Sequence, residues 1–285
     1  MLVRSLACVC LLLWPACAAP DMAREAKTLY ENTDYSGSLR MLKADTSPDA
    51  SGYLLMGKNN YMLDNFATAA HFFEKALTLT PHSSECEMWL GRAYGRRAEN
   101  EGFVTAIAYA TKARQHFEKA VELDANYADA RNDLFDYYLN APGILGGGLE
   151  KAEAIARQIA ATRPAESEFE LSQIAEHRKQ LAEAENHLRR SVELAPGDVG
   201  RMLDLARYLA KHGRIPESDA IFAQASGLAP NDPRVLFARA KTLMEQRRNP
   251  EQAQKLLRQY LESKLTPDDP PRSAALKLLG QAGGR

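Results

Sequence analysis

The six histidines and four cysteines are the residues of this 285-residue chain best suited to bind a metal or to attack a substrate. The histidines are scattered, at positions 71, 82, 116, 177, 187 and 212, and no His-Glu-x-x-His or Gly-x-Ser-x-Gly motif occurs. Three cysteines lie within the first seventeen residues, so Cys86 is alone in the rest of the chain and cannot form an internal disulfide there. We therefore predict no catalytic site, no metal and no cofactor, and we expect Cys86 to be a small buried residue.

Three consecutive glycines, Gly146 to Gly148, precede a predicted helix, where free backbone N–H groups could bind an anion. The segment Asn140–Leu149 has no Lys-Ser/Thr after the glycines and no strand before them. It therefore matches neither the phosphate-loop nor the dinucleotide-binding fingerprint. A long loop that requires positive φ explains the glycines equally well, and both interpretations stay open.

A pattern of small, aromatic and proline residues recurs about every 34 residues, which is the period of a helical hairpin. In one copy, the residues that follow Gly57 at 12, 16, 19 and 24 positions are Ala69, Phe73, Ala76 and Pro81. In another copy, the residues that follow Ala206 at the same distances are Ser218, Phe222, Ala225 and Pro230. The small residues permit two helices to approach closely, and proline ends the second helix.

These residues resemble the consensus of the tetratricopeptide repeat family, which has small residues at three of these positions, an aromatic residue between them and a final proline. The resemblance covers residues 22–267. It implies an all-α, right-handed α-solenoid of about seven stacked hairpins, because one hairpin alone cannot bury both of its faces. Residues 268–285 are predicted to hold a short capping helix, Arg272–Leu279, and a frayed tail.

In the superhelix that this resemblance implies, the first helix of each hairpin lines the inner surface. The candidate groove and peptide-binding residues on these helices are Lys58, Tyr61, Arg92, Arg96, Arg207 and Lys211. The fourth hairpin has Asp136 at the position that corresponds to Lys58, so the groove is predicted to be mixed in charge but locally basic. Such a groove could bind a peptide of acidic character. Solvated charge on an open face is the alternative interpretation.

An insertion at residues 96–111 lengthens the third hairpin and carries Phe103, Val104, Ile107 and Tyr109 beyond the usual repeat. These side chains either close over the fourth hairpin or form an apolar contact site for a partner or a second copy of the chain.

The N-terminus has the pattern of a signal peptide, predicted at residues 1–18. Arg4 is followed by an apolar stretch, Ser5–Trp14, that is too short to span a bilayer, and then by small residues at Ala16 and Ala18. We expect cleavage after Ala18 and export to the periplasm or secretion. Lipidation of Cys17, with association at the outer membrane, is the alternative.

Composition agrees with a binding protein that does not recognise nucleic acid. The chain has 36 Lys and Arg against 37 Asp and Glu, a net charge of -1, which gives no long-range attraction to a polyanion. By the resemblance, we expect a non-enzymatic scaffold for protein or peptide partners in the bacterial cell envelope. The alternative is an accessory component of a transport or secretion system that binds an apolar small molecule. The oligomeric state does not follow from the sequence.

Overall fold

The structure is a computed structural model that describes residues 18–283, and within that range it contains fifteen α-helices, one 3₁₀ helix and no strand. The helices form seven antiparallel hairpins and a final single helix, which confirms the predicted solenoid. The hairpins are α1 (Ala18–Glu31) with α2 (Tyr35–Leu42), α3 (Ala50–Met62) with α4 (Phe66–Leu79), α5 (Ser84–Asn100) with α6 (Phe103–Leu123), α7 (Ala128–Asn140) with α8 (Leu149–Gln158), α9 (Pro164–His177) with α10 (Leu181–Leu194), α11 (Val199–Lys211) with α12 (Ile215–Leu228), and α13 (Pro233–Glu245) with α14 (Pro250–Glu262). The 3₁₀ helix η1 (Gly143–Leu145) lies between α7 and α8, and α15 (Arg272–Gly283) follows the last hairpin.

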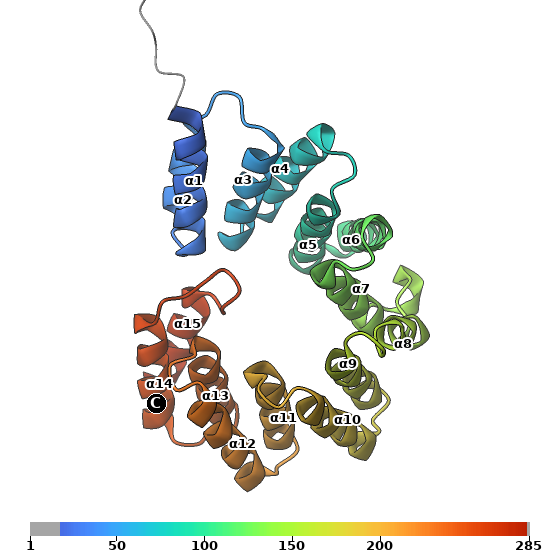
Figure 1. The fold of residues 1–285 in the computed structure, drawn as a ribbon, viewed down its shortest axis with the longest axis vertical. Helices are drawn as coiled ribbons and strands as arrows, with labels where there is room; N and C mark the ends of the chain where they lie inside the picture. Colours follow the sequence, from blue (N-terminus) through green and yellow to red (C-terminus); the bar gives the residue numbers. More distant parts are fainter. Residues whose placement is uncertain (1–17, 284–285) are drawn as a thin grey trace, which may run out of the picture.

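The hairpins follow a nearly complete circle (Figure 1). The first helix of each hairpin from α3 to α13 lies on the inner side of the circle, and the second helix lies on the outer side (Figure 1). The blue N-terminal hairpin and the red C-terminal helices therefore come beside each other, although they are more than 200 residues apart in the sequence.

Helix boundaries follow from caps and prolines. Asp49, Asp198 and Asp232 each accept a hydrogen bond from a backbone N–H in the first turn of the helix that follows, at 2.8 Å. Such caps satisfy N–H groups that have no partner within the helix. Helices α4, α10 and α12 each end two residues before a proline, as the repeat pattern predicts. Pro164 differs, because it is the first residue of α9 instead of the terminator of α8.

The turns of five of the seven hairpins share a left-handed residue. Thr33, Asp64, Lys179, Gly213 and Arg247 all have positive φ, and each is the second residue after the first helix of its hairpin. A residue in this conformation ends a helix by turning the chain back on itself.

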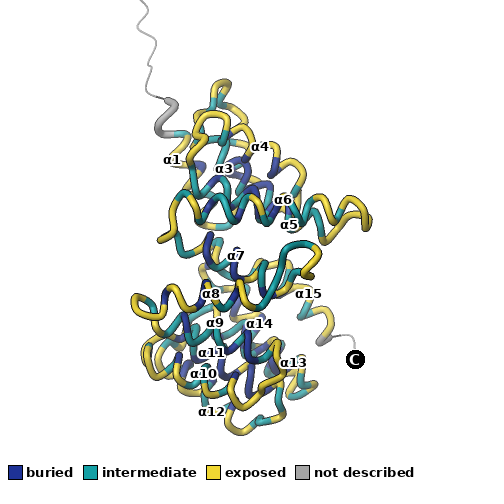
Figure 2. The backbone as a smooth tube through the Cα atoms, turned by 90° about the vertical axis from the view of Figure 1, so that its right-hand side faces the viewer, coloured by how far each residue is buried: buried dark blue, intermediate teal, exposed yellow. Residues whose placement is uncertain are grey.

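Small residues set the distance between the two helices of a hairpin. A Cβ atom added to Gly57 would lie 2.3 Å from Cε1 of Phe73, and one added to Gly91 would lie 2.6 Å from Cε1 of Phe117. Both distances are far below a normal van der Waals contact, so each aromatic ring occupies the space that a side chain would need. Buried residues accordingly line the faces between helices, whereas the turns are exposed (Figure 2).

The insertion in the third hairpin is helical. It extends α5 to Asn100 and starts α6 at Phe103, so that only two residues separate the longest pair of helices. Phe103 and Val104 are each 82% exposed, and they therefore do not close over the fourth hairpin. That interpretation is wrong for these two residues, because the added turns project beyond the neighbouring hairpins instead of packing on them.

Replacing Gly91 with alanine is expected to lower the free energy of unfolding by about 1–3 kcal/mol, because Phe117 and α6 must move to accommodate the methyl group. Gly95 of the same helix is the matched control, since a Cβ there would meet Ala113 at an ordinary 4.0 Å. The Gly95→Ala substitution is expected to stabilise the protein by about 0.5–1 kcal/mol through helix propensity. Urea unfolding followed by circular dichroism measures both, and a stabilised Gly91→Ala variant would contradict the close-contact explanation.

Candidate functional site

All six residues predicted for the groove belong to first helices of hairpins, which lie on the inner side of the circle. The structure does not bring them into a single site. Lys58 and Tyr61 lie on α3, Arg92 and Arg96 lie on α5, and the remaining two, Arg207 and Lys211, lie on α11.

Lys58 and Arg92 are each paired with a carboxylate of the next hairpin. Lys58 Nζ lies 2.5 Å from Glu85 Oε1, and Arg92 Nε donates to Asp133 Oδ2 at 2.5 Å. The side chains of the two cations are only 19% and 25% exposed. We infer that they join neighbouring hairpins and have little capacity left for a partner.

Tyr61 and Arg96 belong to an aromatic cluster around Trp89. The Tyr61 ring meets Trp89 edge-on with 5.3 Å between centroids, and the Arg96 guanidinium lies 5.1 Å from the Phe66 ring centre. Trp89 also has Arg92 at 4.8 Å from its centroid. Cations over ring faces are stabilised by the ring quadrupole, so this cluster contributes to the packing between the second and third hairpins.

The inner face of α7 is acidic, next to the position where the sequence predicts a basic groove. Asp129, Asp133 and Asp136 are four and three residues apart and therefore share one side of the helix. Burial raises the pKa of Asp133 to about 6, although Arg92 opposes the shift, and burial also raises the pKa of Asp136. The surface around Arg92 is consequently not basic, because carboxylates from the next hairpin balance its charge.

A buried ion pair joins α7 to α9. Arg131 Nη1 donates to Glu170 Oε1 at 2.8 Å, Arg131 Nη2 lies 2.8 Å from Glu166 Oε1, and the side chains of Arg131 and Glu170 are both only 3% exposed. Burial raises the pKa of Glu170 to about 7, and the positive charge of Arg131 limits the rise. Removing one member of such a pair leaves a buried charge without compensation.

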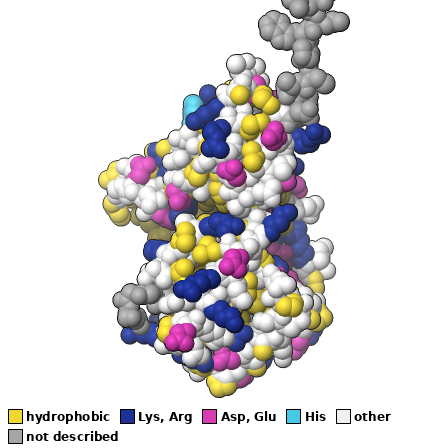
Figure 3. Space-filling view, turned by 90° about the vertical axis from the view of Figure 1, so that its left-hand side faces the viewer, with side chains coloured by type: hydrophobic (Ala, Val, Ile, Leu, Met, Phe, Trp, Pro, Cys, Tyr) yellow, Lys and Arg dark blue, Asp and Glu magenta, His cyan; other side chains and the backbone are white. Residues whose placement is uncertain are grey.

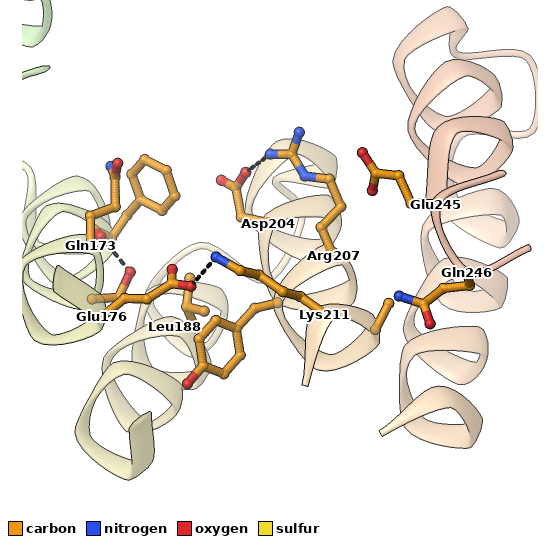
Figure 4. Close-up of a pocket in the computed structure, with 12 residues that line it drawn as sticks. Gln173, Glu176, Leu188, Asp204, Arg207, Lys211, Glu245 and Gln246 are labelled. Atoms are coloured by element: carbon orange, nitrogen blue, oxygen red, sulfur yellow. Dashed lines mark hydrogen bonds and ion pairs between the residues drawn. The ribbon is translucent and has the colours of Figure 1, made fainter. Parts of the chain in front are cut away.

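A pocket of about 410 Å³ opens on the inner surface between α9, α11 and α13 (Figure 4). Two predicted groove residues, Arg207 and Lys211, line it, and their side chains are 50% and 67% exposed. Each is paired within the wall: Arg207 bonds to Asp204, and Lys211 Nζ lies 2.5 Å from Glu176 Oε1. Because both cations are largely accessible, a carboxylate from outside can compete for them.

The opposite wall of the pocket is also polar. Glu245 points from α13 towards Arg207, and Gln246 follows it in the chain (Figure 4). Gln173 of α9 adds a second amide, and Phe169 and Tyr208 supply aromatic surface. The pocket therefore offers donors and acceptors on three helices, with two aromatic rings between them.

Sequence reasoning missed most of this pocket. The repeat pattern identifies Arg207 and Lys211, but it gives no reason to select Gln173, Asp204 or Glu245, which are common residue types at surface positions. Only the stacking of the fifth, sixth and seventh hairpins determines that these side chains share a cavity.

The four residues of the predicted apolar contact site divide into two groups. Phe103, Val104 and Ile107 are exposed at the start of α6. Tyr109 instead stacks on Tyr94 with 5.6 Å between centroids and has the Arg97 guanidinium over its ring. A contact site at this helix tip stays a prediction for the first three residues, whereas Tyr109 packs against α5.

The glycine loop has a conformational explanation. Gly146 has φ of +87°, and a Cβ on Gly147 would lie 1.9 Å from the carbonyl oxygen of Ala141. Tyr137 donates from its hydroxyl to the carbonyl oxygen of Leu145 at 2.9 Å and fixes the loop on α7. Anion binding is not needed to account for these glycines.

Cys86 is 2% exposed, as predicted, and burial raises the pKa of its thiol. Cys17 and the predicted signal peptide, apart from Ala18, lie outside the residues that the structure describes. Within residues 18–283, no three His, Cys, Asp or Glu side chains are grouped so that they could hold a metal. No helix in the same range has the length and apolar character needed to cross a membrane.

A family model described as tetratricopeptide repeat matches residues 176–242, a range that includes Arg207 and Lys211 of the pocket. Residues 176–242 therefore contain tetratricopeptide repeat sequence. Solved structures agree with the fold of the chain over most of its length. A tetratricopeptide repeat protein from Parabacteroides merdae is 12% identical with a TM-score of 0.59, and the match covers 93% of this chain and 98% of that one. A thermophilic protein of this type from Thermus thermophilus is 20% identical with a TM-score of 0.54, over 67% of this chain and 98% of that one.

The Cut9-Hcn1 hetero-tetramer of the APC/C is also similar, with 16% identity and a TM-score of 0.51 over 91% of this repeat protein and 48% of that chain. At these identities the similarity concerns the fold. No match was found among curated proteins.

Because the pKa of Glu170 is higher in the folded protein than its usual value of 4.5, the folded state binds a proton more tightly than the unfolded state. Glu170 therefore stabilises the fold at low pH, and this contribution is lost as pH rises from about 4.5 to about 7. A glutamine cannot lose a proton, so Glu170→Gln should not show this loss. We expect the free energy of unfolding of the variant, minus that of the wild type, to increase by roughly 1–3 kcal/mol as pH rises through that interval.

Denaturant unfolding at several pH values measures this difference. Asp133 titrates in both proteins and cancels in the comparison. The control is Glu193→Gln, which removes a carboxylate whose side chain is 64% exposed and which lies outside the buried pair. Parallel curves for Glu170→Gln and wild type would show that the carboxylate does not titrate in this interval.

Proposed function

We propose that this repeat protein is a non-enzymatic scaffold that binds a segment of a partner protein on its inner surface. The observation that carries the proposal is the pocket between α9, α11 and α13, which places exposed cations, amides and aromatic rings on the face where the hairpins are concave. The pocket walls belong to packed helices, so little conformational entropy is lost when a partner binds. Stacked repeats are suited to this role because they extend one surface over several hairpins.

The chemistry of the pocket favours an extended segment with an acidic side chain. Gln173 and Gln246 can each donate to and accept from a peptide backbone. Arg207 and Lys211 can exchange their own carboxylates for one of the partner, since all four charged groups remain partly accessible to water. Lys58 and Arg92 are less suited to this exchange because their pairs are more deeply buried.

The pocket gives no specific support to the alternative of an apolar small ligand. Its lining includes Glu176, Asp204 and Glu245 as well as the two cations. Transfer of an uncharged apolar molecule into such a site would remove water from charged groups without replacing their hydrogen bonds.

We also propose that the protein acts in the bacterial cell envelope after export. The support is the N-terminal sequence, with its positive residue, short apolar stretch and small residues before Ala19. A scaffold in that compartment would bind other exported or envelope proteins. Attachment through a lipid on Cys17 is the competing arrangement.

Double charge reversal of Arg207 and Lys211 to Glu is expected to weaken binding of an acidic segment by at least about tenfold, because two charge-assisted contacts are replaced by repulsion. Twelve-residue peptides can be selected from a random library on the purified protein, and their affinities measured by fluorescence anisotropy. The matched control reverses Lys119 and Arg190, two cations on outer helices with 42% and 57% exposed side chains. Equal loss in both variants, or failure to select any peptide, would contradict binding in the pocket.

Mass spectrometry of the protein purified from the envelope fraction of a bacterial host is expected to show a chain that begins at Ala19. A Cys17→Ser variant should give the same mature N-terminus, because lipidation plays no part in simple secretion. An acylated N-terminal cysteine would establish the lipid-anchored form instead. A full-length chain in the cytoplasm would contradict export.

A further inference from the structure

The two ends of the solenoid meet across a cavity of about 200 Å³, here called the terminal junction. One side of the terminal junction is formed by Thr33, Tyr35 and Met62, from the first two hairpins. The other side is the segment Leu265–Ser273, which follows α14 and includes the first two residues of α15. Figure 3 views the molecule from the side on which these ends lie, with the N-terminal hairpins above and the C-terminal helices below.

The C-terminal side of the junction is held in shape by its own contacts. Thr266 donates from its backbone N–H and its hydroxyl to Asp269 Oδ2, both at 2.9 Å, and the Tyr260 hydroxyl bonds to the carbonyl oxygen of Pro270. Leu265 is 3% exposed and belongs to the core of the last hairpin. The segment therefore has a surface that does not depend on the N-terminal hairpin.

The contact between the two sides differs from every junction between successive hairpins. Among the described residues, successive hairpins are joined by helices that pack directly on one another, whereas α1, α2 and α3 show no such packing on α14 or α15. A cavity remains where side chains would interdigitate in a core, so little dispersion energy is gained on contact. The carboxylates of Asp268 and Asp269 act on Tyr35 from across the junction, and burial together with these charges raises the pKa of Tyr35 to about 12.

We propose that the terminal junction is a releasable latch, through which the solenoid opens to admit a polypeptide to its inner surface and closes to retain it. Among the described residues, every other junction is packed helix against helix, so we expect the solenoid to separate first where a turn and a preformed segment face each other across a cavity. With the latch closed, a partner chain can pass through the ring of hairpins only if one of its own termini is threaded in first. With the latch open, a partner can enter sideways along its length. This consequence rests on the proposed function, but the latch itself is a property of the free protein.

Distances between spin labels test the latch without a partner. The exposed residues Ser36 and Ser273 are changed to cysteine in a full-length chain in which the four native cysteines are replaced by serine or alanine. Pulsed electron resonance is expected to show two populations of distance, one closed and one open. A control pair at Thr78 and Glu122, on α4 and α6, spans a packed junction and should give one narrow distribution.

Substitution of Tyr35 gives a matched comparison, because it faces the two carboxylates. Tyr35→Glu adds a like charge and should shift the labels towards the open population. Tyr35→Lys loses the same ring but adds an opposite charge, and it should hold the closed one. We expect the ratio of closed to open molecules to differ by at least about threefold between the variants, and the difference to shrink at high salt.

Identical distributions in the two variants, or a single population in the wild-type protein, would overturn the latch. A control pair that broadens together with the junction pair would also overturn it, because the whole solenoid would then be flexing. Neither result affects peptide binding in the pocket, which the charge reversal at Arg207 and Lys211 tests separately.

Discussion

The approach of an aromatic ring to a residue without a side chain is the contact on which the other features of this structure depend. Phe73 against Gly57 and Phe117 against Gly91 bring the two helices of a hairpin so close that no other residue fits between them. Where the small residue is Ala206, the hydroxyl of Ser218 donates to its backbone carbonyl at 2.7 Å instead. Repetition of this contact gives hairpins of similar thickness, which can stack in one direction and curve.

Polar contacts between hairpins decide which part of the concave surface can serve a partner. In the N-terminal half, cations on α3 and α5 are taken up by carboxylates of the following hairpin. At the centre, Arg131 and Glu170 connect α7 to α9 through side chains that are both only 3% exposed. Beyond α9, Arg207 and Lys211 instead lie at the margin of a cavity, with side chains that are 50% and 67% exposed. The same residue types therefore have two roles, which depend on how closely the next hairpin approaches.

The fold could be predicted from the sequence, because its signals are local and repeated. The residues from Gly57 to Pro81 all belong to one hairpin. Their spacing in the sequence therefore follows directly from the geometry of its two helices. The charge of the groove could not be predicted in this way. Lys58 and Glu85 are 27 residues apart, and their pairing depends on the rotation between two hairpins, which no residue pattern encodes. The insertion at 96–111 shows the same limit, since its apolar residues suit either a covered or an exposed helix tip.

Cys86 has a consequence for the compartment in which such a protein would act. Its sulfur is enclosed near the start of α5, and the pKa of the thiol is raised, so very little of the reactive thiolate is present and none of it is accessible. Oxidants and disulfide-exchange enzymes therefore have little access to the Cys86 thiol in the folded protein. In oxidising surroundings such an array would keep Cys86 reduced, and the part of the chain that the structure describes would be held together by the packing of its hairpins and not by a disulfide.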